Sequence, residues 1–256
     1  MKLILGIPTG GKPAEPFLRS LKGLQLAPSI TAFENKTATG NFVPAQRELI
    51  ADYAIDRGAD YLMMVDDDMV VPPDAMARML EPFRDPTVGL VGALCYSRDG
   101  LRPMAVTDWN PADTTRASIP AFDDRTPTSV DGIGFGMVLI RMATLGRMER
   151  PFFPVQVYIE RSAARVRICN EDFLFCKRVR DQGELVMLHP GVRCGHYDRD
   201  SQKTYPLNWE QPENTNFKRM MVQEAGGAIG IKAFDSTVGR IEEKHRSAFL
   251  DYILVD

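Results

Sequence analysis

A run of five apolar residues, Tyr61–Val65, leads directly into three consecutive aspartates, Asp66, Asp67 and Asp68. An apolar stretch of this length is typical of a strand that is buried on both faces, as in parallel sheets covered by helices. Adjacent carboxylates at the end of such a strand repel one another unless a cation or hydrogen-bond donors compensate them. The pattern therefore predicts an α/β sheet with an acidic site at the carboxyl end of one strand.

Apolar runs and amphipathic segments alternate along the chain around this feature. The patterns predict strands at residues 2–7, 88–95, 104–107, 137–140, 185–188 and 192–194. They predict helices at 15–24, at 46–57, after Pro72-Pro73-Asp74, at 171–182 with Asn170 as N-cap, and at about 240–252. We expect one α/β domain with a mostly parallel central sheet and helices on both of its faces.

Two polar stretches interrupt this alternation. Residues 97–129 are poor in hydrophobic residues and contain several prolines, which predicts a loop-rich insertion. Residues 197–216 are still poorer in hydrophobic residues and predict a mobile surface segment, which the last helix follows. Trp109 and Trp209 in these stretches are candidates for stacking on a ligand, or are local packing anchors.

Composition excludes several classes of protein. With 31 basic and 34 acidic residues the net charge is −3, so we expect no general binding to nucleic acid. No apolar run approaches the roughly 20 residues of a membrane helix, and residues 1–5 reach Gly6 and Pro8 early, so we expect neither a membrane helix nor a secretory signal. The cysteines show no CxxC spacing, and we expect them to be buried thiols in a reducing compartment: Cys95, Cys169, Cys176 and Cys194. A cytoplasmic protein is therefore expected.

The aspartate triplet is a candidate metal site. A hard divalent ion such as Mg²⁺ or Mn²⁺ takes oxygen ligands, often one or two carboxylates together with substrate phosphates. The carboxyl ends of strands are also where open α/β sheets bind ligands. The alternative is a solvated turn in which Asp68 or Asp74 caps the next helix.

Three further segments carry candidate site residues. Glu171 and Asp172 open a predicted helix, where the positive end of the helix dipole stabilises acidic side chains. Either residue is also a candidate general base. His196 follows a predicted strand as a metal ligand or as a residue bonded to backbone, whereas His189 is interpreted as structural and His245 as solvated. Asp131 is a candidate ligand-binding residue, a candidate catalytic acid or base, or a turn cap.

These motifs together resemble the GT-A-fold glycosyltransferases that use nucleotide diphosphate sugars, especially family-2-like bacterial and phage enzymes. The matching features are Arg47 on the helix before the strand, a D-x-D motif at Asp66–Asp68, an E-D motif at Glu171–Asp172, and a Gly-His pair ending at His196. The resemblance covers about residues 1–198 in short segments. Thr9-Gly10-Gly11-Lys12 departs from the Asn or Arg residues common after the first strand, which leaves UDP or GDP open.

The resemblance implies a role for each matching residue. The metal site would consist of Asp68 and His196, which ligate the ion, and Asp66, which approaches the ribose or a metal-bound water. The imidazole would favour Mn²⁺ over Mg²⁺. The resemblance favours Asp172 as the catalytic base, with Glu171 and Asp131 as the alternatives. The nucleotide sugar would be bound by Ile7, Pro8, Thr9, Arg47, Asp66, Asp67 and Gly134.

The sequence thus predicts a metal-dependent glycosyltransferase that moves a sugar from a nucleotide diphosphate sugar to a glycan or other acceptor hydroxyl. Residues 1–96 would bind the donor, 130–198 the acceptor, and 199–256 would form a C-terminal mobile segment and closing helix. Acceptor choice would come from residues 97–129 and the polar tail. The alternatives are a nucleotidyltransferase of similar build and a non-catalytic protein that binds nucleotide or carbohydrate.

Overall fold

The computed structural model describes residues 1–98, 100, 102–111, 117–118, 120–160, 165–206 and 253–255. The predicted helix at 240–252, Trp209 and His245 therefore lie outside the described residues. Within the described part, the main strands are β1 (Lys2–Thr9), β2 (Ala32–Thr39), β3 (Tyr61–Val65), β5 (Val88–Leu94), β7 (Thr128–Ser129), β9 (Met137–Arg141) and β12 (Leu185–Arg193). The helices are α1 (Glu15–Lys22), α2 (Val43–Asp56), α3 (Ala75–Leu80), α4 (Met142–Leu145), α5 (Glu171–Asp181) and the 3₁₀ helix η1 (Glu81–Arg84).

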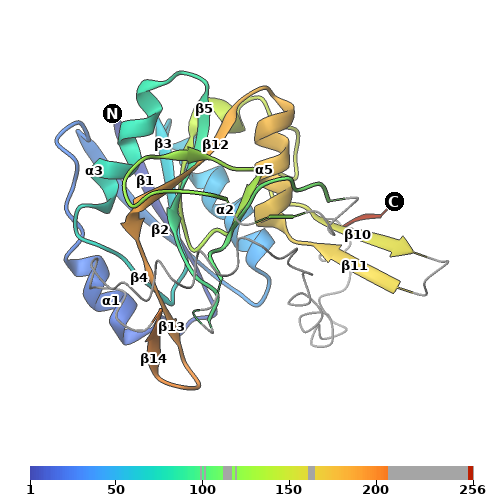
Figure 1. The fold of residues 1–256 in the computed structure, drawn as a ribbon. Helices are drawn as coiled ribbons and strands as arrows, with labels where there is room; N and C mark the ends of the chain where they lie inside the picture. The colour runs from blue at the N-terminus through green and yellow to red at the C-terminus, as the bar shows by residue number, and fades with distance from the viewer. Residues whose placement is uncertain are drawn as a thin grey trace.

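The seven main strands form one sheet in the order β2-β1-β3-β9-β5-β12-β7 (Figure 1). Strand β1 runs parallel to β2 and β3, and β5 runs parallel to β12, but β9 is antiparallel to both β3 and β5. Strand β7 is antiparallel to β12. The central sheet is thus mixed, and the prediction of a mostly parallel sheet was wrong.

The physical reason lies in the connection between β5 and β9. A parallel neighbour needs a crossover that returns the chain to the other end of the sheet, usually through a helix. The described residues between β5 and β9 contain the short strands β6 (Ala105–Val106), β7 and β8 (Gly132–Ile133), and no helix. The chain therefore turns back at the end where it left and enters β9 in the opposite direction.

Helices cover both faces of the sheet, as predicted. Alternate residues of β3 point to opposite faces: Leu62 and Met64 pack with α2 and α5, whereas Met63 and Val65 pack with α1 and α3. All five residues of β3 are buried, so the predicted strand Tyr61–Val65 is confirmed to the residue. Two layers of apolar side chains thus hold the ends of these strands in place.

Small sheets extend the molecule at two sides (Figure 1). Strand β13 (Gly195–Asp198) lies between β4 (Met69–Val70) and β14 (Lys203–Tyr205) and is antiparallel to both. The hairpin of β10 (Val155–Glu160) and β11 (Arg165–Cys169) pairs with β15 (Ile253–Val255). The first part of the predicted mobile segment therefore forms strands instead.

Several local predictions need adjustment. Helix α2 starts earlier than predicted, and the two strands predicted at 185–194 form the single strand β12, with an irregularity before Arg193. Asn170 takes the N-cap position of α5, but its side chain makes no capping hydrogen bond. All four cysteines are buried and free, as predicted. No helix among the described residues has the length and apolar character needed to cross a membrane.

Candidate active site

The three aspartates lie in the turn between β3 and β4, and backbone hydrogen bonds fix this turn to three other segments. The Asp66 amide donates to the Gly136 carbonyl at 3.0 Å. The carbonyls of Asp67 and Asp68 accept from Ala14 and Tyr197, each at 2.8 Å. The turn is thereby held against the start of β9, the start of α1 and strand β13.

Each aspartate of this turn pairs with a different arginine. Asp66 Oδ1 lies 2.8 Å from Arg47 Nη2, and Asp67 Oδ1 lies 3.0 Å from Arg199 Nη2. Asp68 Oδ2 lies 2.9 Å from Arg98 Nη2, and it also faces His196. The compensation that three adjacent carboxylates require therefore comes from arginines of α2, of the turn after β5 and of the turn after β13.

Arg47 connects the turn to α5. Its side chain is only 3% exposed, and its guanidinium lies over the Phe135 ring at 4.9 Å. Its Nη1 lies 3.3 Å from Glu171 Oε1, so one buried cation serves both Asp66 and Glu171. The D-x-D and E-D segments, far apart in sequence, meet at this side chain.

Asp172 completes the acidic group at the start of α5. Its Oδ1 accepts the Phe173 amide at 2.7 Å, and its carboxyl is half-buried. Burial and, after it, the charge of Glu171 raise the pKa of Asp172 to about 7. Burial also raises the pKa of Asp66 to about 6, although Arg47 opposes that shift.

Asp68 and His196 form a buried pair of oxygen and nitrogen donors. Strand β13 pairs His196 with Met69 of β4, which places the imidazole beside the preceding Asp68. His196 Nε2 and Asp68 Oδ2 are 3.4 Å apart, and both side chains are about nine-tenths buried. No larger metal-binding group of His, Cys, Asp or Glu occurs in the described part of the chain. Two such donors fit an ion whose remaining ligands are water and phosphate oxygens.

The residues expected to hold the nucleotide lie at the end of β1. Ile7, Pro8 and Thr9 are all buried, and Thr9 Oγ1 donates to Asp67 Oδ2 at 2.5 Å. The Gly11 amide donates in turn to Thr9 Oγ1 at 3.0 Å. This loop is therefore bonded directly to the aspartate turn.

Asp131 and Gly134 have structural partners instead. Asp131 Oδ1 accepts from Arg180 Nη1 at 2.8 Å, and Oδ2 accepts from the Trp109 amide at 3.2 Å. A Cβ added to Gly134 would lie 2.3 Å from Met104 Cε, so its small size serves packing. Gly134 does not have a positive φ, which among the described glycines occurs at Gly11, Gly58, Gly100 and Gly183. Trp109 is buried edge-to-face against Phe173 at 5.3 Å, as a packing residue.

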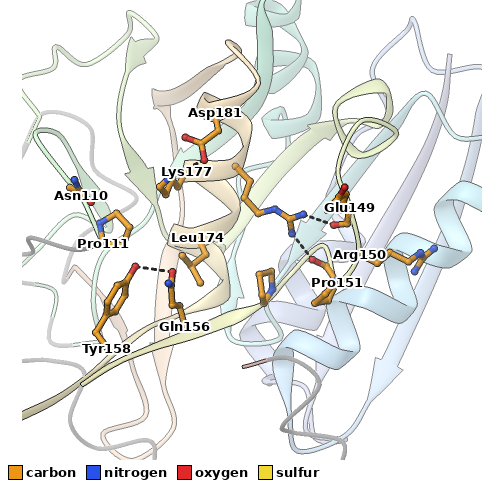
Figure 2. Close-up of a pocket in the computed structure, with 12 residues that line it drawn as sticks. Asn110, Pro111, Glu149, Arg150, Pro151, Gln156, Tyr158, Leu174, Lys177 and Asp181 are labelled. Carbon is orange, nitrogen blue, oxygen red and sulfur yellow. Dashed lines mark hydrogen bonds and ion pairs between the residues drawn. The ribbon is translucent and has the colours of Figure 1, made fainter. Parts of the chain in front are cut away.

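A cavity of about 530 Å³ lies along the outer side of α5 (Figure 2). Tyr158 and Gln156 of β10, Lys177 and Asp181 of α5, and Asn110 line it. Tyr158 donates to Gln156 at 2.7 Å, and Lys177 pairs with Asp181 at 2.6 Å. None of the sequence-predicted site residues lines this cavity.

Neither Arg98 nor Arg199 was predicted from the sequence as a site residue. Both lie just after a strand, at the same end of the sheet as the aspartate turn: Arg98 after β5 and Arg199 after β13. The sequence feature that could have indicated these two arginines is a basic residue shortly after a strand. Their contacts with Asp68 and Asp67 span 30 and 132 residues, and local sequence patterns carry no information on such pairs.

Comparisons with known proteins find solved structures whose fold is similar to that of this chain. No protein-family model and no curated protein matches the chain. The structure of A197 from STIV is similar at 18% identity and TM-score 0.54, over 80% of this chain and 93% of that one. GalNAc-T7, a glycosyltransferase solved with UDP, GalNAc and Mn²⁺, is similar at 13% identity and TM-score 0.53, over 77% of this chain. This chain spans 44% of GalNAc-T7, and the likeness is one of fold.

Proposed function

We propose that this protein is a metal-dependent glycosyltransferase that transfers a sugar from a nucleotide diphosphate sugar to an acceptor hydroxyl. One observation carries the proposal: Arg47 holds Asp66 at 2.8 Å and Glu171 at 3.3 Å. A donor-side acid and an acceptor-side acid thereby share one site at the carboxyl ends of the strands, where open α/β sheets bind ligands. The similarity in fold to GalNAc-T7, a glycosyltransferase that was solved with UDP and Mn²⁺, supports the proposed glycosyltransferase function.

The donor would lie against the end of β1 and the aspartate turn. The nucleobase and ribose would contact Ile7, Pro8 and Thr9. The hydrogen bond from Thr9 to Asp67 keeps this loop beside the acids. Arg47 would hold Asp66 ionised and oriented toward the ribose. Gly134 would act only through its packing against Met104.

Asp68 and His196 would hold the ion, with Mn²⁺ favoured by the mixed oxygen and imidazole donors. When bound, such an ion neutralises the charge of a departing diphosphate. The His196 Nδ1 lies 2.7 Å from the Tyr96 carbonyl, which orients the ring and leaves Nε2 facing Asp68.

Asp172 would accept the proton of the attacking hydroxyl. A pKa of about 7 suits a general base, because the carboxylate is available at neutral pH and still binds a proton. Glu171 is held by Arg47, and both oxygens of Asp131 are bonded to other groups. These contacts favour Asp172 over the other two acids.

The acceptor would reach Asp172 from the cavity beside α5. Lys177 and Asp181 of the same helix line this cavity, and Asn110 belongs to the 97–129 segment that was predicted to choose the acceptor. Polar and aromatic linings of this kind suit a hydroxylated ligand. In this proposal residues 1–96 bind the donor and 130–198 the acceptor, in a cytoplasmic protein.

Thermal shift with UDP, GDP and their sugars, with and without Mn²⁺, tests the proposal. We expect stabilisation by at least one nucleotide diphosphate, only when Mn²⁺ is present, and loss of that stabilisation in Asp68→Ala. A nucleotidyltransferase would instead be stabilised by a nucleoside triphosphate. No stabilisation by any nucleotide diphosphate with Mn²⁺ would refute the transferase function.

A further inference from the structure

Arg98 contacts both of the residues that would hold the ion. It lies in the turn after β5, where the Ser97 amide donates to the Arg102 carbonyl at 2.9 Å. Its Nη2 donates to Asp68 Oδ2 at 2.9 Å, and its Nε donates to His196 Nε2 at 3.3 Å. A single guanidinium thus covers the Asp68–His196 pair.

The hydrogen bonds of Arg98 engage lone pairs of His196 Nε2 and Asp68 Oδ2, which would also bind a metal ion. A carbonyl oxygen only accepts hydrogen bonds, so the 2.7 Å contact with Tyr96 places the ring hydrogen of His196 on Nδ1. In the neutral ring this leaves a lone pair on Nε2, which accepts from Arg98. Because Nε2 has a single lone pair, an ion that binds it displaces Arg98, which also donates to Asp68 Oδ2.

Arg98 differs from the other two arginines of the aspartate turn in how easily it can leave. Arg47 is 3% exposed and fixed between Asp66 and Glu171. Arg199 also donates to the Lys12 carbonyl at 2.6 Å. The Arg98 side chain is 66% exposed, whereas the backbone around it is held by the hydrogen bond from the Gly100 amide to the Ser97 carbonyl at 2.7 Å. Rotation of the side chain alone would therefore open the pair.

We propose that Arg98 is an exchangeable cation, which covers Asp68 and His196 until a divalent ion binds and then moves to the diphosphate of the donor. This inference rests on the proposed function. The displaced guanidinium stays next to the ion, because its turn is anchored, and a guanidinium is well suited to bind phosphate oxygens with two parallel hydrogen bonds. Ion binding and diphosphate binding are thereby coupled through one side chain.

The test measures Mn²⁺ affinity without nucleotide, from the electron paramagnetic resonance signal of free Mn²⁺, and UDP and GDP affinity at saturating Mn²⁺. In Arg98→Ala we expect Mn²⁺ to bind about twofold to fivefold more tightly, since no side chain competes with it. We expect the nucleotide to bind about tenfold more weakly, since a charged hydrogen-bond partner is lost. Arg98→Lys, whose ammonium cannot contact both acceptors in the same way, should lie between the wild type and Arg98→Ala.

Arg102→Ala is the matched control, because it removes a positive charge from the same turn at an exposed position. It should leave both affinities unchanged. If the wild type binds Mn²⁺ and nucleotide, but Arg98→Ala matches Arg102→Ala in both titrations, the exchange is refuted and the proposed function stands. If neither the wild type nor Arg98→Ala binds Mn²⁺, both proposals fail.

Discussion

Arg47 Nη2 lies 2.8 Å from Asp66 Oδ1, and this ion pair is the centre of the acidic site. The arginine side chain is 3% exposed and also faces Glu171, so it holds two carboxylates that come from opposite halves of the sequence. A buried cation with two anionic partners fixes their relative position. It also makes the site depend on that cation for its stability.

Removing this cation should destabilise the fold. We expect Arg47→Ala to cost about 3–5 kcal/mol, because it leaves the carboxylates of Asp66 and Glu171 without their buried partner. Arg47→Lys, which keeps the charge, should lose less. Urea unfolding at pH 8 measures both, and Arg57→Ala, which breaks an exposed pair with Glu34, should cost below about 1 kcal/mol. Equal losses for Arg47→Ala and Arg57→Ala would contradict the role of Arg47.

The fold was predictable where burial leaves a clear mark on the sequence. Strand β3 is buried on both faces, so all five of its residues are apolar and its limits could be read directly. Strand β2 at the edge of the sheet is largely exposed, and its polar sequence hid it. The direction of β9 was not predictable from its own residues, because an apolar run is the same in either direction. The connection before β9 decides that direction.

The candidate site was predictable in part, for a related reason. Asp68 and His196 could be selected from the sequence because each closely follows a strand that the sequence predicts, at 61–65 and at 192–194. The arginines that compensate the acids are distant in sequence, as the contact between Arg199 and Asp67 illustrates. Only the folded topology brings them together. The sequence therefore indicated the acids together with Arg47 and His196, but not Arg98 and Arg199, which pair with Asp68 and Asp67.

The proposed base predicts how the rate depends on pH. Burial and the charge of Glu171 raise the pKa of Asp172 to about 7, and a base must be ionised, so the rate should rise with pH. We expect kcat/KM to increase about tenfold from pH 6 to pH 8 and then to level off. Asp172→Asn should abolish transfer while UDP or GDP still binds with Mn²⁺. A rate that is flat or falls over this range would exclude Asp172 as the base.

The same shift predicts a stabilising substitution. Because the pKa of Asp172 is raised from its ordinary value of 3.8, the folded state holds its proton more tightly, and stability is lost as pH rises from about 4 to about 7. Asp172→Asn carries no charge to bury, so at pH 8 it should be about 1–2 kcal/mol more stable than the wild type, allowing for solvent screening. The difference should vanish near pH 4. Urea unfolding at both pH values measures it, and Asp181→Asn on the same helix should change stability by less than about 0.5 kcal/mol at either pH.

Asp131 should matter for stability and little for catalysis. Its two carboxylate oxygens accept from Arg180 and from the Trp109 amide, so neither is directed to a substrate. Asp131→Ala should lower the free energy of unfolding by about 1–3 kcal/mol, because it leaves these donors without their acceptor. Transfer by the folded fraction should stay within about threefold of the wild type, the range for a residue outside the reacting group. Loss of transfer in a variant that folds normally would instead assign Asp131 as the acid or base.

The cavity beside α5 makes a separate prediction about the acceptor. Tyr158 lines it with a half-buried ring, whose hydroxyl donates to Gln156 at 2.7 Å. In Tyr158→Ala we expect the KM for acceptor to rise about tenfold, because an aromatic contact of about 1.4 kcal/mol is lost, with nucleotide affinity unchanged. Tyr158→Phe keeps the ring and should raise KM less. Transfer to a panel of p-nitrophenyl glycosides, assayed at saturating donor and Mn²⁺, gives the KM values. An unchanged KM in Tyr158→Ala would place the acceptor elsewhere, and weaker nucleotide binding would assign this cavity to the donor.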